Sequence, residues 1–400
     1  MKIYGNNRVY GRVLEIVLYF LYKRCYNQQE NRKKKENNMI NLEENNLKFY
    51  FNKNKLIENY NKFSKDGDIY YPLKTNSNEN LIKALSTLLN KANNGYLISS
   101  LHHFELLKKL GINPNQMCFI NVLAEKETIR YLYDNGVRFF TFDCLKSLGE
   151  FVEYANLREV KIAIRLSTMQ IYKDKFTHLG AELEETLRMI EFLKRNGSSN
   201  YGISFYIQKN IKTENNVFEN ILQYIQEKYS DSNLKFVSIG GINTEINHKV
   251  LDDLKSKLKI EQIILEVGRY LVEDTIELET RIIRDKMIGN TKTIVIKNGI
   301  YSGFFDILLY NKRFQLYFKT ENNEEIKFEY EKSQTADYEV YICGGSSDSG
   351  DKIGIMYIDS AYKNELITGG KIIIKNVGAY FEEFFMPYSK DLRKVYIDKK

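Results

Sequence analysis

Cysteine and histidine are scarce in this chain, with four of each among 400 residues. The cysteines, at positions 25, 118, 144 and 343, form no Cys-x-x-Cys pair and no spacing typical of a metal site. We therefore expect no metal centre. Unpaired cysteines also favour reduced thiols, and hence a cytoplasmic protein.

A long hydrophobic run is missing as well. The most apolar stretch near the N-terminus, residues 13–22, contains Glu15 and is too short for a bilayer, which needs about 20 apolar residues per helix. No small-residue cleavage site of a signal peptide follows it. The sequence therefore predicts no stable membrane insertion. For residues 1–38 we expect a basic, poorly ordered extension, with an amphipathic membrane anchor as the alternative.

An excess of one charge is absent from most of the chain. The formal net charge is +7, and residues 1–38 alone contribute +6, from nine Lys and Arg side chains against three Glu. The rest of the chain is therefore nearly neutral, which does not suit a surface that follows nucleic-acid phosphates. We expect no nucleic-acid partner.

From about residue 66 the chain alternates between short apolar segments and longer amphipathic ones, whose apolar residues lie three and four positions apart. Eight such units are typical of an α/β fold of the (β/α)8 TIM-barrel type, because an open doubly wound sheet usually stops at about six strands. The expected strands are residues 68–73, 95–99, 117–121, 138–142, 160–166, 202–207, 234–239 and 262–265, and the expected helices are 81–89, 104–110, 125–133, 181–194, 217–228 and 245–258.

A different pattern, with apolar residues at every second position, begins after about residue 284 and predicts a C-terminal β-rich domain over residues 284–400. The barrel is expected at 66–283. Residues 39–65 are expected to supply a strand and a helix that join the β domain to the barrel. The expected strands outside the barrel are 47–51, 293–296, 314–319, 325–330, 339–343, 371–374 and 394–397.

Three polar features fall at predicted carboxyl ends of barrel strands, where TIM-barrel enzymes place their active sites. Lys74 follows the first strand, Gly240-Gly241 follows the seventh, and the segment 266–270 (EVGRY) follows the eighth. Alone, Lys74 would be a solvated loop residue and Gly240-Gly241 an ordinary turn. Because the first and eighth strands are adjacent in a closed barrel, the three features together indicate one site.

The residue types of this site favour pyridoxal phosphate as the cofactor. Glycines let backbone amides approach a phosphate, and Arg269 can neutralise its charge. A lysine such as Lys74 can hold the cofactor as a Schiff base, while a carboxylate such as Glu266 keeps the pyridine nitrogen protonated.

In their order along the chain, these motifs resemble those of the fold-type III pyridoxal-phosphate decarboxylases, the ornithine/diaminopimelate/arginine decarboxylase family, over residues 45–398. Tyr71-Pro72-Leu73-Lys74 is similar to the family's YAVK-type motif, and Gly240-Gly241 to its GGG-type loop. The segment 266–270 is similar to EPGRY, and Gly378-Ala379-Tyr380 to GAY. The resemblance implies an alanine racemase-like barrel, an amino-acid decarboxylase, and a homodimer with shared active sites.

The resemblance also assigns roles to individual residues. Tyr206 stands where the family has a histidine that stacks on the cofactor ring, Lys209 where it often has a phosphate-binding serine, and Leu97 where it commonly has an acidic residue. Asp143 also matches a family position and is expected to cap a helix. The implied cofactor-binding residues are Lys74, Arg165, Tyr206, Lys209, Gly240, Gly241, Glu266, Gly268, Arg269 and Tyr380.

The largest departure from the family is at Ser347-Asp348. In the family a cysteine followed by Asp or Glu reaches the active site from the partner subunit, and the cysteine returns a proton to the substrate carbon after carbon dioxide leaves. A serine hydroxyl is a far poorer acid than a thiol, whose reference pKa is about 8.5. The resemblance implies Lys74, Ser347 and Asp348 as the catalytic residues. Because Ser347 replaces the cysteine, we expect that water or another group donates the proton, or that the turnover is slower or its outcome altered.

The substrate is expected to be an amino acid with a distal amine, such as ornithine, lysine or diaminopimelate. Asp306, Asn311 and Asp348 are the expected substrate contacts. The acidic groups of Asp306 and Asp348 favour a distal amine over a distal carboxylate, and Asn311 stands where the family has an aspartate. Two alternatives stay open: a racemase or atypical decarboxylase that uses the same cofactor, and a non-catalytic decarboxylase homologue.

Overall fold

The computed structural model describes residues 47–90, 93–170, 177–207, 217–242, 248–385, 392 and 394–399. The expected basic extension over residues 1–38 and the expected cofactor contact Lys209 lie outside these ranges.

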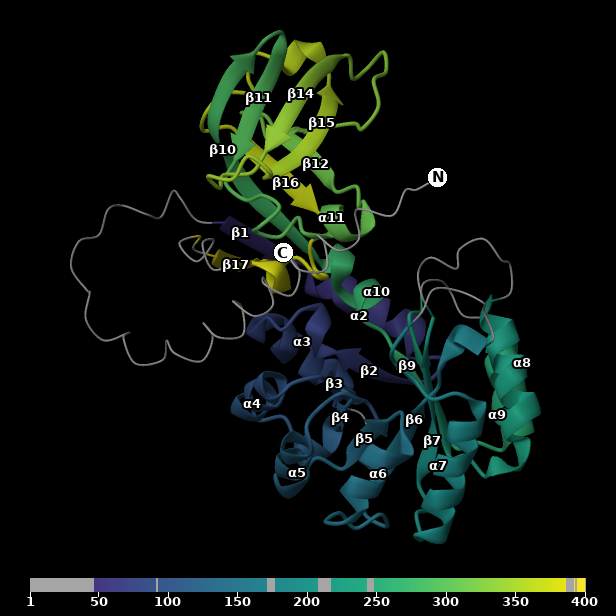
Figure 1. Cartoon of the computed structure of the whole chain (residues 1–400). Coiled ribbons are helices and arrows are strands. Elements are labelled where there is room, and N and C mark those ends of the chain that lie inside the picture. Colours follow the sequence, from purple (N-terminus) through teal and green to yellow (C-terminus); the bar gives the residue numbers. More distant parts are fainter. Residues whose placement is uncertain are drawn as a thin grey trace, which may run out of the picture. The chain divides into compact units, whose positions relative to one another are not determined.

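Eight parallel strands close into a barrel (Figure 1). The first strand pairs with the last through Asp68 with Ile264 and Ile69 with Leu265. The predicted (β/α)8 barrel is therefore confirmed, and each predicted strand is present with boundaries shifted by a few residues. The strands are β2 (Asp68–Pro72), β3 (Gly95–Ile98), β4 (Met117–Phe119), β5 (Phe139–Phe142), β6 (Lys161–Arg165), β7 (Tyr201–Tyr206), β8 (Phe236–Gly240) and β9 (Gln262–Glu266).

Helices follow the barrel strands and lie around them (Figure 1). The first of them starts at Glu79, two residues before the expected start, and the Asn78 side chain caps it by accepting hydrogen bonds from the N–H groups of Asn80 and Leu81. Its apolar residues, three and four positions apart, are buried. The helices are α3 (Glu79–Leu89), α4 (Leu101–Lys109), α5 (Lys126–Asp134), α6 (Leu145–Val152), α7 (Leu183–Arg195), α8 (Val217–Tyr229) and α9 (His248–Leu258).

The sequence missed α6, a short helix that contains Gly149. The predicted helix cap at Asp143 is also wrong. Cys144 occupies the N-cap position of α6, and its side chain makes no capping hydrogen bond. Asp143 Oδ2 instead accepts a hydrogen bond from the backbone N–H of Gly180, 2.9 Å away. Asp143 therefore ties the start of α6 to the loop that precedes α7.

The C-terminal part forms a nine-stranded, mostly antiparallel sheet, which confirms the predicted β domain. The expected boundary at residues 283 and 284 falls inside β10 (Ile276–Ile288), a long strand that follows the last barrel strand after a short helical segment and pairs with β1, β11 and β16. The elements are β1 (Leu47–Phe51), β10 (Ile276–Ile288), β11 (Thr291–Ile296), β12 (Gln315–Lys319), β13 (Glu325–Lys327), β14 (Tyr338–Cys343), β15 (Lys352–Ile358), β16 (Lys371–Lys375), β17 (Lys394–Asp398) and the short helix α11 (Asp306–Tyr310).

The first strand and helix of the described chain contact the C-terminal sheet and the segment after the barrel, respectively. β1 pairs with β10 and β17 of the C-terminal sheet. The next element, α2 (Lys53–Phe63), contacts α10 (Arg269–Val272), the short helix that follows the last barrel strand. The Asn59 side chain of α2 donates hydrogen bonds to the Leu271 carbonyl at 3.3 Å and to Asp274 Oδ1 at 2.6 Å.

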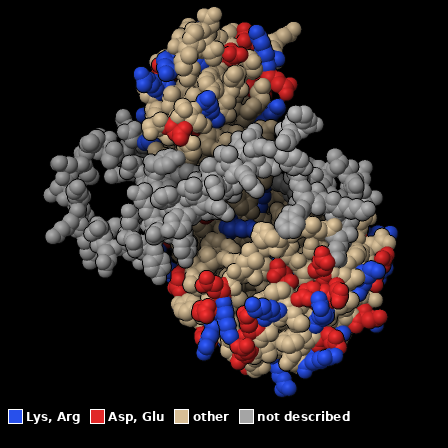
Figure 2. All heavy atoms as spheres, viewed as in Figure 1, with Lys and Arg blue, Asp and Glu red and all other residues tan. Residues whose placement is uncertain are grey.

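On the face shown in Figure 2, positive and negative side chains are interspersed over the barrel helices. None of the helices in the described ranges combines the length and the apolar character that a membrane crossing requires.

Candidate active site

Lys74 lies in the 3-10 turn Leu73–Thr75, immediately after β2 and thus at the carboxyl end of the first barrel strand. The turn is held from both sides. Tyr71 Oη donates to the Asn76 carbonyl at 2.9 Å, and the Thr75 carbonyl accepts from the backbone N–H of Tyr380 at 2.8 Å. The polypeptide around Lys74 is therefore fixed by its own strand and by the C-terminal domain.

The Lys74 side chain is accessible to water, yet the surrounding protein desolvates it. This desolvation lowers the pKa of Lys74; the carboxylate of Glu266 raises it, and the positive charge of Arg165 lowers it further. A lowered pKa enlarges the neutral fraction of the amine, and the neutral amine is the nucleophile. Lys74 is therefore suited to attack a carbonyl carbon.

Glu266 is the last residue of β9, and its carboxylate is oriented by the neighbouring strand. Ser238 Oγ of β8 donates a hydrogen bond to Glu266 Oε1 at 2.7 Å. Burial raises the pKa of Glu266, while the Ser238 hydrogen bond and the charges of Arg165 and Lys74 lower it. The predicted pair of Lys74 and Glu266 therefore lies within electrostatic reach, with Arg165 at the end of β6 acting on both.

Gly240 and Gly241 leave room beside Glu266 at the end of β8. A Cβ on Gly240 would lie 2.9 Å from Glu266 Oε2. Gly241 has a φ of +75°, and a Cβ there would lie 2.1 Å from the Ile207 carbonyl oxygen. Larger residues do not fit at these positions without displacing the backbone, so glycine is required at the strand end where a phosphate loop is expected.

Arg269 is the first residue of α10 and follows Gly268, its N-cap residue. Its guanidinium carbon lies 4.9 Å from the centroid of the Tyr380 ring, and Tyr380 Oη is 3.4 Å from Thr75 Oγ1. A Cβ on Gly268 would lie 2.4 Å from Thr75 Oγ1. The predicted residues Gly268, Arg269 and Tyr380 are therefore brought together directly beside the Lys74 turn.

Tyr206, at the end of β7, belongs to the same group. The pKa of Tyr206 is raised by desolvation and then by Tyr380 and Tyr310, and it is lowered by Arg269 and Arg165. Its side chain is nevertheless 45% exposed. A ring that is surrounded by polar side chains yet open to water has a free surface on which an aromatic ligand can stack.

The two expected substrate contacts on α11 differ in their surroundings. Asp306 is buried, and its Oδ2 is 2.9 Å from Arg269 Nη2. Asn311 is exposed, has a left-handed φ of +51° and ends the helix with its N–H on the Ile307 carbonyl. The structure therefore joins Asp306 to the phosphate-binding candidate Arg269 and leaves Asn311 facing solvent.

Ser347 and Asp348 lie in the exposed loop between β14 and β15. They line a cavity of about 450 Å³ together with Lys297 and Tyr301. No hydrogen bond or ion pair among the described residues joins this loop to Lys74. The sequence reasoning missed the residue that shapes the loop, the buried Asp351, whose carboxylate accepts hydrogen bonds from the N–H groups of Ile300 at 2.6 Å and Ser346 at 3.1 Å.

A second feature missed from the sequence is a contact between the Lys74 loop and the segment after β16. Glu383 Oε1 accepts from both the N–H and the hydroxyl of Ser77, at 2.6 and 2.7 Å, and Asn76 Nδ2 donates to the Gly378 carbonyl at 3.0 Å. The only sequence signal for this contact was the neighbouring Gly-Ala-Tyr motif. The C-terminal segment thus fixes the loop between Lys74 and α3.

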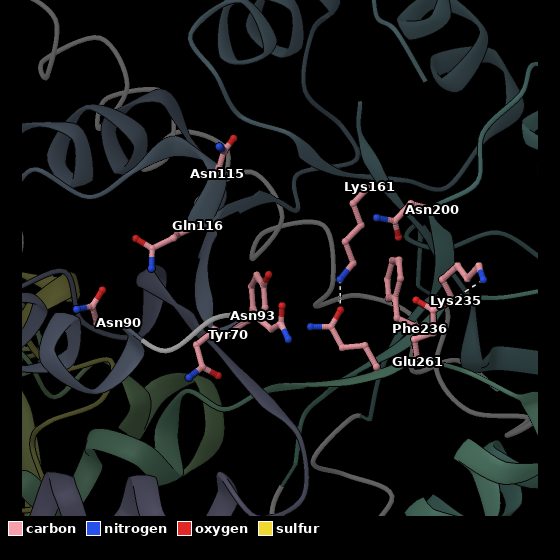
Figure 3. Close-up of a pocket in the computed structure, with 12 residues that line it drawn as sticks. Tyr70, Asn90, Asn93, Asn115, Gln116, Lys161, Asn200, Lys235, Phe236 and Glu261 are labelled. Atoms are coloured by element: carbon pink, nitrogen blue, oxygen red, sulfur yellow. Dashed lines mark hydrogen bonds and ion pairs between the residues drawn. The ribbon is translucent and has the colours of Figure 1, made fainter. Parts of the chain in front are cut away.

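A cavity of about 510 Å³ lies at the opposite end of the barrel, at the amino ends of the strands. Figure 3 shows Lys161 reaching into it. The Lys161 ammonium lies 4.7 and 4.2 Å from the ring centroids of Phe139 and Phe236 and donates to Gln262 Oε1. Burial lowers the pKa of Lys161 to about 8, against smaller opposing effects of Cys118 and Asp68.

Replacing Lys161 with methionine is expected to stabilise the protein at pH 7 by about 1 to 2 kcal/mol, because the folded state no longer carries a desolvated ammonium. The folded pKa lies below the unfolded value, so the wild-type penalty is complete below the folded pKa of about 8 and is relieved as the pH rises towards about 10.4. Denaturant unfolding at pH 7 and pH 10 checks this. An advantage that is equal at both pH values would contradict it.

The described site fits pyridoxal phosphate on the chemistry of its own residues. Lys74 supplies an amine of lowered pKa, Glu266 a buried carboxylate, and Gly240 and Gly241 a backbone surface that a Cβ would fill. The predicted cofactor contact Lys209 lies outside the described residues.

Comparisons with known proteins identify the family of the chain. Residues 53–273, more than half of the 400-residue chain, match a family described as "Pyridoxal-dependent decarboxylase, pyridoxal binding domain". Lysine/ornithine decarboxylase of Selenomonas ruminantium is 23% identical over 331 residues, which cover 78% of each protein. Antizyme inhibitor 2 of Xenopus laevis is 24% identical over 348 residues, which cover 78% of this chain and 71% of that protein.

Among solved structures, lysine decarboxylase from Selenomonas ruminantium has a TM-score of 0.70 at 18% identity, and the match covers 88% of this chain and 93% of that one. The two chains therefore share their fold.

Proposed function

We propose, since the chain belongs to the pyridoxal-dependent decarboxylases, that it releases carbon dioxide from an amino acid with a distal amine, such as ornithine, lysine or diaminopimelate. The cofactor of this family is pyridoxal phosphate, and Lys74 is proposed to bind it covalently as a Schiff base. The observation that carries the proposal is the pairing of Lys74, whose pKa is lowered by desolvation, with the buried carboxylate of Glu266 at adjoining ends of β2 and β9.

When bound, pyridoxal phosphate supplies a ring that accepts the electron pair left by the departing carboxylate. The residues of the chain hold and tune it. Glu266 places a negative charge that favours a proton on the ring nitrogen, and Ser238 orients that carboxylate. Tyr206 offers a stacking surface, and Arg165 adds positive charge at the end of β6.

The phosphate is proposed to lie against main-chain groups of Gly240, Gly241 and Gly268, with Arg269, Tyr380 and Lys209 as further contacts. Neighbouring protein atoms leave no space for a Cβ at these three positions, and glycine-rich turns of this kind can bring backbone N–H groups close to an anion.

Asp348 is proposed to bind the distal amine of the substrate. Asn311 and Asp306 are proposed to lie near that amine. Asp348 is exposed and lies in a loop that Asp351 holds in place. Ser347 beside it is the proposed replacement for the family's acidic cysteine. Because a hydroxyl donates a proton less readily than a thiol, we propose that proton return to the substrate carbon is slow in this protein.

We further propose that the protein is a homodimer in which Ser347 and Asp348 complete the site of the partner subunit. Mixing Lys74→Ala and Asp348→Ala subunits is then expected to restore activity that neither variant has alone. Random exchange gives one intact site in each mixed dimer, hence about a quarter of the wild-type activity. If the mixture has only the summed activity of the two variants, each chain contains its whole site.

Within the described residues, Cys118, Cys144 and Cys343 are free thiols, which supports a reducing compartment, so the reaction is proposed to occur in the cytoplasm.

A screen of amino acids for release of carbon dioxide tests the proposed function. The protein loaded with pyridoxal phosphate is expected to act on substrates with a distal amine and to release one carbon dioxide per diamine formed. Exchange of the α-hydrogen without carbon dioxide would indicate a racemase instead. Absence of both reactions for every amino acid would identify a non-catalytic homologue.

A further inference from the structure

Arg269 is held in a line of four alternating charges that crosses from the barrel to the C-terminal domain. Its Nη1 is 2.6 Å from Glu273 Oε1 and its Nη2 is 2.9 Å from Asp306 Oδ2. Glu273 Oε1 in turn accepts from Lys312 Nζ at 2.7 Å. Arg269 and Glu273 flank α10, whereas Asp306 and Lys312 flank α11, so the two short helices are joined by opposite charges at both ends.

The contact between Arg269 and Asp306 is the more deeply buried part of this line. The side chain of Arg269 is 12% exposed and that of Asp306 is 2% exposed. The second carboxylate oxygen of Asp306, Oδ1, is buried and has no hydrogen-bond partner in the described part of the chain. A carboxylate this far from water is costly unless a positive charge faces it, so Asp306 depends on Arg269 in this structure.

The geometry also restricts Arg269. A guanidinium is planar and has five N–H groups in fixed directions. Two of them point at Glu273 and Asp306, and the ring of Tyr380 lies 4.9 Å from the guanidinium carbon. Two anchored N–H groups and one flanking ring determine the plane of the guanidinium, and thereby the direction of its remaining donors.

We infer that Asp306 is a positioning residue that orients Arg269 towards an anionic oxygen ligand, the phosphate of the cofactor, and acts on the substrate only indirectly. This inference rests on the proposed phosphate site. Asp306 reaches Arg269 from the helix that ends at Tyr310 and Asn311. The substrate side of the site and the phosphate side are therefore linked through one buried ion pair.

Binding of pyridoxal phosphate and of pyridoxal, which lacks the phosphate, distinguishes positioning from a merely structural role. Equilibrium dialysis against the apo protein measures both affinities without turnover. Asp306→Ala is expected to weaken pyridoxal phosphate binding about tenfold and to leave pyridoxal binding within about twofold, because only the phosphate contacts Arg269. Asp306→Asn keeps an oxygen acceptor for Arg269 and is expected to show a smaller loss.

Two further variants complete the test. Asp274→Asn is the matched control, since Asp274 is a nearby carboxylate that pairs with Asn59 and Lys55; it is expected to bind both compounds as the wild type does. In an Arg269→Ala background, Asp306→Ala is expected to cause no additional loss of pyridoxal phosphate affinity, because its effect passes through Arg269.

The contradicting results are distinct. If Asp306→Asn loses affinity for pyridoxal phosphate and for pyridoxal equally, Asp306 has a general structural role. If that variant binds pyridoxal phosphate more tightly than the wild type, Asp306 only opposes the anion by its charge. Either result overturns the inference while the proposed function stands. If the wild type binds neither compound, the proposed function fails together with the inference.

Discussion

Replacing Lys74 with alanine is expected to abolish release of carbon dioxide, with a fall of at least about 10³-fold, and to remove the covalently bound, visibly absorbing form of the cofactor. The physical reason is that Lys74 is the amine at the carboxyl end of β2, desolvated and within electrostatic reach of Glu266. Alanine leaves the turn intact, because its fixing hydrogen bonds run through Tyr71, Asn76 and Thr75. Absorbance and carbon dioxide assays on the same preparation check this.

Lys161→Met is the matched control for this prediction. Lys161 is also a lysine whose pKa is lowered by burial, but it lies at the amino ends of the strands, beside Phe236 and Gln262. The variant is expected to bind the cofactor covalently and to retain activity. If Lys161→Met loses the visible absorbance and Lys74→Ala keeps it, then Lys161 binds the cofactor at the amino ends of the strands, and the site proposed at Lys74 is wrong.

Replacing Glu266 with glutamine is expected to lower kcat by about 10²- to 10³-fold while the cofactor stays covalently bound. An amide has the shape of the carboxylate but no charge, so it no longer favours a proton on the ring nitrogen, and the ring accepts electrons less well. The neighbouring Ser238 still has an oxygen to donate to. Turnover and absorbance measured together separate this effect from loss of the cofactor.

Ser238→Ala provides a graded comparison. Ser238 donates to Glu266 Oε1 at 2.7 Å, and this hydrogen bond lowers the pKa of Glu266. Its loss is expected to reduce kcat only a few-fold, because it removes about 1 kcal/mol of orientation and leaves the charge in place. A loss in Ser238→Ala that equals that of Glu266→Gln would contradict the role given to the carboxylate.

The barrel could be predicted from the sequence because its strands are buried on both sides. Such strands are short, continuous apolar runs, and eight of them at regular spacing leave few alternatives. The boundary with the β domain was harder to predict, since β10 runs without interruption from mostly buried residues at its start to exposed residues at its far end. Nothing in the sequence around residue 283 marks a domain boundary, because residue 283 lies in the middle of a continuous strand.

The site was predictable where it depends on strand order. Lys74, Gly240, Gly241 and Glu266 follow strands that must be neighbours in a closed barrel, so their proximity follows from topology. Contacts that depend on how side chains turn were not predictable. Glu383 with Ser77 joins positions 306 residues apart in sequence, and no periodicity signals such a pair.

Asp306 shows the same limit in another form. Its residue type suggested attraction for a substrate amine, but its charge is met by Arg269, 37 positions earlier in the chain. Whether an acidic residue binds a ligand or another residue depends on which cation is closest in the folded chain, and that is decided by the docking of α11 against α10.

Peptide mapping after borohydride reduction tests the central claim most directly. Reduction makes the bond between a lysine and pyridoxal phosphate permanent, and mass spectrometry then identifies the modified peptide. The account predicts one pyridoxyl group per chain, on the peptide that contains Lys74. Modification of a different lysine in place of Lys74, or no modification of protein saturated with pyridoxal phosphate, would contradict it.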